Sequence, residues 1–280
     1  MSERKSVGIA VVAIALLMLF VLTGCSRTIP TPGNTISPQA TISIVLTPIP
    51  EELSDSSCST ESQQLDESGV QHFRDGDVES AIDDWKAALE LDPTCAEVHY
   101  NLGKAYYDEQ DYAKALQHLQ EAVRLVPDSS TAQYNLGLAY AVLGHLEEAR
   151  KAFDNATWIE PEYADAYFNL GVVNYQLGDL DSAVFDFENV LVIRPNDVFA
   201  LYNLGLALYS RGDIDRSVDR WEETVALSPA YAEAFYGLGL AYAKQGNLSA
   251  AKEAFQRCID IRPESSLAAD ARRELDRLGP

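Results

Sequence analysis

Proline and glycine recur along this chain with a fixed period of 34 residues. Half of the twelve prolines keep this spacing, and they are Pro93, Pro127, Pro161, Pro195, Pro229 and Pro263. A set of glycines keeps the same period, each 24 residues before a proline: Gly69, Gly103, Gly137, Gly171, Gly205 and Gly239. A fixed period of this length is typical of a solenoid, in which equivalent units stack along one axis. The period therefore predicts a linear stack of six units.

The unit 96–129 has the pattern of two amphipathic helices joined by a turn. Packing residues recur on one helical face in each half, at His99, Leu102, Gly103 and Tyr106, then at Ala115, Leu119 and Ala122. Gln110 and Asp111 occupy the turn, where three other units have Gly-Asp. We expect Gly103 to let the two helices approach closely, and Pro127 to end the second helix.

This arrangement resembles the tetratricopeptide repeat (TPR). Within each unit, position 8 is always Gly, position 32 is always Pro and position 24 is always large and apolar, over the ranges 62–95, 96–129, 130–163, 164–197, 198–231 and 232–265. The resemblance implies an all-α fold, a right-handed TPR superhelix (α-solenoid) of six helix-turn-helix repeats. Residues 266–280 carry an amphipathic pattern that predicts a C-terminal capping helix.

The first 24 residues have the layout of a secretory signal peptide. Arg4 and Lys5 precede an uncharged apolar stretch, and the sequence Leu-Thr-Gly-Cys then ends at Cys25. This run resembles the lipobox of bacterial lipoproteins, which implies cleavage before Cys25 and attachment of lipid, palmitate included, to its thiol. The alternative is an uncleaved membrane helix, but the apolar stretch of 16 residues is shorter than the ~20 that a spanning helix needs.

Residues 25–61 are rich in Pro, Ser and Thr and lack helical periodicity. Prolines block helix formation, so this segment predicts a flexible tether between the anchor and the repeats. Ile42, Ile44 and Leu46 alternate as in a short strand, but no partner strand is evident. We expect a lipid-anchored protein on the extracytoplasmic face of the cell membrane, or alternatively on the inner face of an outer membrane.

The composition argues against several classes of function. The formal net charge is -22, which repels nucleic-acid backbones and makes a nucleic-acid partner unexpected. Four scattered histidines and the absence of a CxxC pair or a nucleotide-binding loop predict no metal, no cofactor, no small-molecule substrate and no catalytic residue. We therefore expect that the protein is not an enzyme.

An asparagine row is the first candidate for partner binding. In the TPR fold the first helix of each repeat lines the concave face, and position 6 there is Asn101, Asn135, Asn169 and Asn203. An amide both donates and accepts hydrogen bonds, so such a row can pair with the backbone of an extended peptide. This looks like the asparagine ladder of some peptide-binding TPR arrays. The alternative is that Asn is simply the commonest residue at that position.

Apolar residues flank this row at positions 5 and 9. The candidates for partner contact are Tyr134, Phe168 and Tyr202 at position 5, and Leu138, Val172 and Leu206 at position 9. Apolar and aromatic side chains beside amides suit a peptide or an amphipathic helix laid along a groove. The alternative is packing between repeats, which explains most of the pattern at position 5.

Cys58 and Cys95 are candidates for a disulfide. Cys58 precedes the first helix of repeat one, for which Thr60 and Gln63 predict a capping box, and Cys95 follows the second helix. Because the two helices are antiparallel, these ends lie side by side, and a bond would stabilise the repeat by about 3 kcal/mol. The alternative is that both thiols stay reduced. Cys258 lies at a packing position, so we expect a buried free thiol.

These features predict a lipid-anchored adaptor that binds a protein or peptide in its concave groove. A second hypothesis is an assembly factor resembling the pilotins of type IV pili, which are also TPR lipoproteins, although the long tether argues against it. A third is a regulator of a cell-wall enzyme.

Overall fold

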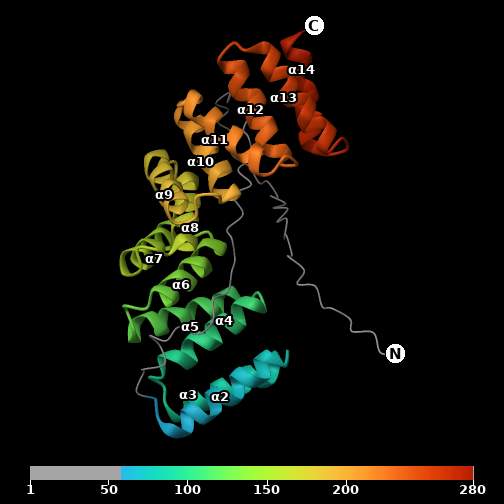
Figure 1. The fold of residues 1–280 in the computed structure, drawn as a ribbon. Coiled ribbons are helices and arrows are strands. Elements are labelled where there is room, and N and C mark those ends of the chain that lie inside the picture. Colours follow the sequence, from blue (N-terminus) through green and yellow to red (C-terminus); the bar gives the residue numbers. More distant parts are fainter. Residues whose placement is uncertain (1–57, 280) are drawn as a thin grey trace, which may run out of the picture. The chain divides into compact units, whose positions relative to one another are not determined.

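The computed structural model describes residues 58–279, which form thirteen α-helices and no strand (Figure 1). Their bounds are α2 (Thr60–Arg74), α3 (Val78–Leu91), α4 (Ala96–Asp108), α5 (Tyr112–Leu125), α6 (Ser130–Val142), α7 (Leu146–Ile159), α8 (Ala164–Leu177), α9 (Leu180–Ile193), α10 (Val198–Arg211), α11 (Ile214–Leu227), α12 (Ala232–Lys244), α13 (Leu248–Ile261) and α14 (Ser266–Leu278). The signal peptide, Cys25, the short strand and most of the tether lie outside the described residues.

Each repeat is a pair of helices, and each pair packs on the next. The second helix of a repeat contacts the first helix of the following one, as α3 contacts α4 and α7 contacts α8. The last helix, α14, packs on α13 and α12. This arrangement confirms the predicted all-α solenoid with its closing helix. No helix within residues 58–279 has the length and apolarity that a membrane crossing requires.

The periodic glycines make room for the large side chain at position 24 of the same repeat. A Cβ atom on Gly137 would lie 2.6 Å from the ring of Phe153, and one on Gly239 would lie 2.5 Å from the ring of Phe255. These distances are far inside van der Waals contact, so no larger residue fits there without moving the ring. The predicted close approach of the two helices is confirmed in all six repeats.

The turn inside each repeat needs a left-handed backbone at position 15. Glycine supplies it in five repeats, for example at Gly178 with φ 82° and Gly212 with φ 100°. In repeat two the residue is Gln110, with φ 62°, the one non-glycine residue with positive φ among those described. A side chain makes this conformation costly, so repeat two folds despite a locally unfavourable turn.

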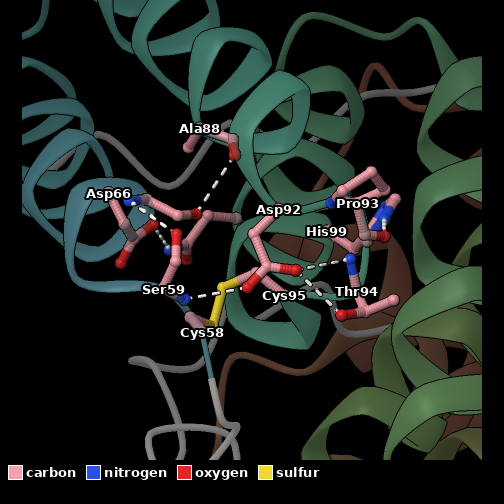
Figure 2. The surroundings of a disulfide bond; sticks show 11 residues. Cys58, Ser59, Asp66, Ala88, Asp92, Pro93, Thr94, Cys95 and His99 are labelled. Atoms are coloured by element: carbon pink, nitrogen blue, oxygen red, sulfur yellow. Dashed lines mark hydrogen bonds between the residues drawn. A yellow bond between two sulfur atoms is a disulfide. The ribbon is translucent and has the colours of Figure 1, made fainter.

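The N-terminal repeat is closed by a disulfide between Cys58 and Cys95, whose Cα atoms are 5.0 Å apart (Figure 2). The bond joins the residues just before α2 and just after α3, which are the antiparallel ends that the sequence pattern places side by side. Cys258 is buried and free, and burial raises the pKa of its thiol to about 12. Such a thiol stays protonated and unreactive at neutral pH.

Hydrogen bonds reinforce the disulfide at the same end of the repeat. The Ser59 backbone N–H donates to Asp92 Oδ2 at 2.8 Å, and the Ser62 hydroxyl donates to the Ala88 carbonyl at 3.1 Å (Figure 2). The cap of α2 differs from the prediction: Ser59, and not Thr60, accepts from the backbone of Ser62. Helix α2 therefore starts one residue earlier than a cap at Thr60 implies.

Candidate functional site: the row of first helices

The first helices of the repeats (α2, α4, α6, α8, α10 and α12) form one row, which we call the inner row. Contacts join α4 to α6, α8 to α10, α10 to α12 and α12 to α14. The predicted partner-binding residues all belong to this row, at positions 5, 6 and 9 of the repeat.

The structure buries all ten of these residues. None is more than 7% exposed, and the set is Asn101, Asn135, Asn169, Asn203, Tyr134, Phe168, Tyr202, Leu138, Val172 and Leu206. A side chain this deeply buried cannot reach a partner unless neighbouring side chains move. The contacts of the buried residues therefore favour packing between repeats, while their role in partner binding stays a prediction.

Three of the four asparagine amides connect their repeat to the one before it. Asn135 Nδ2 donates to the hydroxyl of Tyr100, and Asn169 Nδ2 donates to the hydroxyl of Tyr134, both at 3.1 Å. Each pair spans 35 residues, one repeat plus one position. Positions 5 and 6 thus form a ladder of side-chain hydrogen bonds inside the array, which satisfies polar groups that burial would otherwise leave costly.

Repeat one ends this ladder with a carboxylate. Asn101 Nδ2 donates to Asp66 Oδ1 at 2.8 Å. Burial raises the pKa of Asp66, and the hydrogen bond from Asn101 partly offsets that effect. Nearby, burial followed by the charges of Asp66 and Glu67 raises the pKa of Glu97 to about 7. The first two repeats therefore hold two carboxyl groups, Asp66 and Glu97, whose burial disfavours their charged form.

The ladder is interrupted between repeats four and five. Position 5 of repeat four is Phe168, which has no hydroxyl. Asn203 Nδ2 donates to the Phe199 carbonyl of its own helix at 2.8 Å, as Asn135 Nδ2 also does to the Thr131 carbonyl at 2.9 Å. The inter-repeat hydrogen bond seen at Asn135 and Asn169 is therefore missing at this junction.

We expect Phe168→Tyr to restore this bond and raise the free energy of unfolding by about 0.5–1 kcal/mol, a typical net value for one hydrogen bond. The reverse change at an intact rung, Tyr134→Phe, should lower stability by a similar amount. Urea unfolding followed by circular dichroism measures both. A destabilised Phe168→Tyr variant would show that the pocket at this junction has no room for the hydroxyl.

The exposed part of the inner row is aromatic toward its C-terminal end. Phe199, at position 2 of repeat five, is 63% exposed. Tyr175 is half-buried and its hydroxyl lies 2.9 Å from Ser210 Oγ, while Lys244 Nζ lies 4.2 Å from the ring centre of the half-buried Tyr209. The side chains of Phe199, Tyr175, Tyr209 and Lys244 are therefore at least partly accessible to solvent, unlike the buried asparagines.

Sequence reasoning missed Phe199, although a signal was present. Position 2 is polar in every other repeat, with Gln63, Glu97, Thr131, Asp165 and Glu233. On either side of Phe199 the equivalent carboxylates form ion pairs, Asp165 with Arg194 at 2.7 Å and Glu233 with Arg262 at 2.5 Å. A large apolar residue at a position that is otherwise polar is therefore a signal for an exposed side chain that a partner could contact.

The described residues contain no group of three or more His, Cys, Asp or Glu side chains converging on a metal position. The accessible side chains of the first helices include the aromatic ring of Phe199, the carboxyl group of Glu233 and the ammonium group of Lys244, whereas the asparagine amides are buried.

Comparison with known proteins identifies the repeat. A family model described as "Tetratricopeptide repeat" matches residues 69–130, 100–157, 134–198 and 202–266. No protein of curated function matches the sequence.

Solved structures share the fold. YrrB, described as a TPR protein with an unusual peptide-binding site, is 26% identical with a TM-score of 0.62, over 68% of this chain and 97% of its own. A MamA structure is 29% identical with a TM-score of 0.58, over 62% of this chain and 94% of its own. Pseudomonas aeruginosa PilF, at 18% identity and a TM-score of 0.62 over 76% of this chain and 97% of its own, shows similarity of fold alone. The family match covers most of the chain, which belongs to the tetratricopeptide-repeat family.

Proposed function

We propose that this protein is a lipid-anchored, extracytoplasmic adaptor that binds a protein or peptide partner on the concave face of its TPR array. TPR proteins are in general scaffolds for protein interaction, and the solved relative YrrB is described as having a peptide-binding site. The lipobox-like sequence ending at Cys25 supports the anchor. The tether would then hold the bound partner near the membrane.

The observation that carries the partner site is the exposure of Phe199. A side chain of this size that is 63% exposed, with accessible tyrosines along the same row of helices, suits a partner with an apolar segment. The buried asparagine ladder beneath supports a rigid face, and rigidity reduces the entropy that binding must overcome.

Photo-crosslinking tests the face with a matched control. Phe199 and Phe185 are 63% and 62% exposed, but Phe185 lies on α9, a second helix, outside the inner row. We expect benzoylphenylalanine at 199 to crosslink a discrete partner in native membranes, and the same group at 185 to give no such product. Phe199→Ala should weaken binding of that partner by roughly tenfold, as for an aromatic anchor. A partner that crosslinks only from 185 would place binding on the other face.

Lipid attachment is tested separately. We expect labelling with a palmitate analogue and membrane retention in the wild-type protein, and loss of both in Cys25→Ala. Cys258→Ala is the matched control, because that thiol is buried and has no place in anchoring. Label that survives Cys25→Ala would contradict the anchor while leaving the partner site untouched.

The two alternative functions have no supporting observation of their own. PilF and PilW, a type IV pilus biogenesis factor, are only 18% and 19% identical to this chain and share its fold. No described contact favours a cell-wall enzyme as the partner over any other protein.

A further inference from the structure

Three large apolar side chains are exposed on the second helices of repeats three and four, and we call them the outer patch. Trp158 on α7 is 81% exposed, and Val192 and Phe185 on α9 are 79% and 62% exposed. The proposed partner site uses first helices instead, so the outer patch plays no part in it (Figure 1).

The positions of the outer patch are polar or small in the other repeats. Position 22 is Phe185 in repeat four, and elsewhere it is Asp83, Gln117, Lys151, Asp219 and Glu253. Position 29 is Trp158 in repeat three and Val192 in repeat four, and elsewhere it is Glu90, Arg124, Ala226 and Asp260. The fold therefore does not require large apolar residues at these positions. Their clustering in two successive repeats indicates a surface that another molecule covers.

A cavity of about 290 Å3 adjoins the outer patch where α9, α10 and α11 meet. Val192 belongs to both the patch and the cavity. The lining combines apolar residues with charged ones: Leu191, Val192 and Leu204, then Glu188, Arg216, Asp219 and Arg220. An apolar cavity of about 150 Å3 is large enough to hold benzene, so this cavity has room for the larger indole ring of a tryptophan.

The repeat symmetry makes the patch and the cavity one continuous surface. Val192 at position 29 and Asp219 at position 22 of the next repeat line the same cavity. Trp158 and Phe185 hold these same two positions one repeat earlier, so they flank the equivalent groove between α7 and α9. The apolar surface therefore runs from Trp158 across α9 to the cavity.

The charges around the cavity suit a second copy of this acidic chain. The two arginines of the lining balance its two carboxylates, whereas the whole chain carries a net charge of -22. Two copies therefore meet the least electrostatic repulsion at such a locally neutral region. A strongly basic partner would bind better to the acidic remainder of the surface.

The arginines of the cavity also complement the surroundings of Trp158. Arg216 pairs with Glu188 at 2.5 Å and Arg220 pairs with Glu223 at 3.0 Å, so both guanidinium groups are held beside the cavity. A guanidinium group attracts the face of an aromatic ring, and an indole most strongly. The exposed Asp154 lies one helical turn before Trp158, so a carboxylate accompanies the ring.

We propose that a second copy of this chain covers the outer patch, and that Trp158 of each copy enters the cavity of the other. This arrangement is two-fold symmetric, because each copy presents both the ring and the cavity on the same surface. Along the array α9 lies between α7, which carries Trp158, and α11, which carries the arginines (Figure 1). The two-fold axis therefore passes near α9 and brings the Phe185 rings of the two copies together. The inner row of each copy stays open.

The size of the surface sets the strength of the dimer. The three side chains of the outer patch expose roughly 400 Å2 of apolar area, and a standard interface buries about 800 Å2 on each partner. We therefore expect a dissociation constant on the order of micromolar. Unfolding measured well below that concentration reports the monomer.

Photo-crosslinking in native membranes tests the dimer with the full chain. Two versions that carry different tags are expressed together, each with benzoylphenylalanine at position 158. We expect a covalent product that contains both tags, with the crosslink mapped to residues 188–220. The same group at 185 should also join two copies, in a product that its two tags distinguish from a crosslink to any other protein. Position 260 is the control, because Asp260 holds position 29 on α13 and is exposed.

A substitution at the cavity tests the insertion of Trp158. Val192→Asp, combined with benzoylphenylalanine at 158, should reduce the two-tag product at least about tenfold, because it places a carboxylate where the ring enters. Val192→Thr is the matched control of similar size and should keep the product. Val192 is exposed, so neither change should alter the helical circular dichroism. Absence of the two-tag product, or a product that Val192→Asp leaves undiminished, would overturn the proposal.

Tryptophan fluorescence distinguishes a second copy from a lipid surface. Trp158 is exposed, whereas Trp85 and Trp221, the other two tryptophans, are 2% and 0% exposed. The full chain is placed in phosphatidylcholine vesicles with brominated acyl chains. We expect the emission to move to shorter wavelength as the number of chains per vesicle rises, without quenching by bromine, and Trp158→Phe to lose this shift. Quenching at the lowest chain density would assign the outer patch to the bilayer, and emission that is constant at every density would also contradict the dimer.

Discussion

Replacement of Trp221 by alanine is expected to lower the free energy of unfolding by about 3–5 kcal/mol, the range for removing a large aromatic residue from a core. Trp221 is fully buried on α11, and its ring fills the space beside Gly205 and Gly237. Its Nε1–H donates to the Tyr202 carbonyl at 3.1 Å. The change therefore leaves a cavity between repeats five and six and removes the side-chain hydrogen bond to the Tyr202 carbonyl.

Trp158 provides the matched control, because it is the same residue type but 81% exposed on α7. Trp158→Ala should change stability by less than about 0.5 kcal/mol. Guanidinium unfolding followed by far-UV circular dichroism measures both variants. Since repeats contact only their neighbours, hydrogen exchange should show the loss of protection in residues 198–265 and much less in 62–129. Equal destabilisation by the two substitutions would contradict this account of the core.

The fold followed from the sequence because its strongest signals are steric. Gly205 can only be glycine with Trp221 against it, and the same relation at Gly137 and Phe153 recurs one period at a time. Comparison of equivalent positions therefore predicts that the glycine at position 8 packs against the large side chain at position 24 of the same repeat. It also placed Cys58 and Cys95 at neighbouring helix ends, where the structure joins them.

The candidate site was harder to predict from the sequence than the fold. The 34-residue period specifies which face of a helix a residue occupies, but it does not specify how closely the next repeat packs against that face. Asn135 and Asn169 lie on the first helices α6 and α8, but the preceding repeat approaches closely enough to bury them against tyrosine hydroxyls. Phe199 does not recur at its position in the other repeats, so the repeat pattern does not point to it.

A buried carboxyl group in repeat four is expected to make the free energy of unfolding depend on pH. Asp186 is 3% exposed, and its one hydrogen bond comes from Asn174 Nδ2 at 2.8 Å. The Oδ1 atom of Asn174 is also buried and has no partner among the described residues. Burial, with smaller contributions from Asp154 and Asp179, raises the pKa of Asp186 from 3.8 to about 7. The folded protein thus binds a proton that the unfolded chain releases at lower pH.

The raised pKa fixes the sign of the pH dependence. Between pH 4 and 7 the folded state holds more protons at Asp186 than the unfolded state, so this group makes stability fall as pH rises, with no further loss well above 7. Asp186→Asn removes the charge, and its new amide can donate to Asn174 Oδ1 while still accepting from Nδ2. We expect the variant to be more stable than the wild type by roughly 1–3 kcal/mol at pH 8, with a much smaller gain at pH 5.

Thermal and urea unfolding at both pH values measure the gain in the free energy of unfolding. The control is Asp219→Asn, because Asp219 is an exposed carboxyl group on α11. A gain that is the same at pH 5 and pH 8, or a loss at pH 8, would show that Asp186 is not the strained group that its burial and single hydrogen bond indicate.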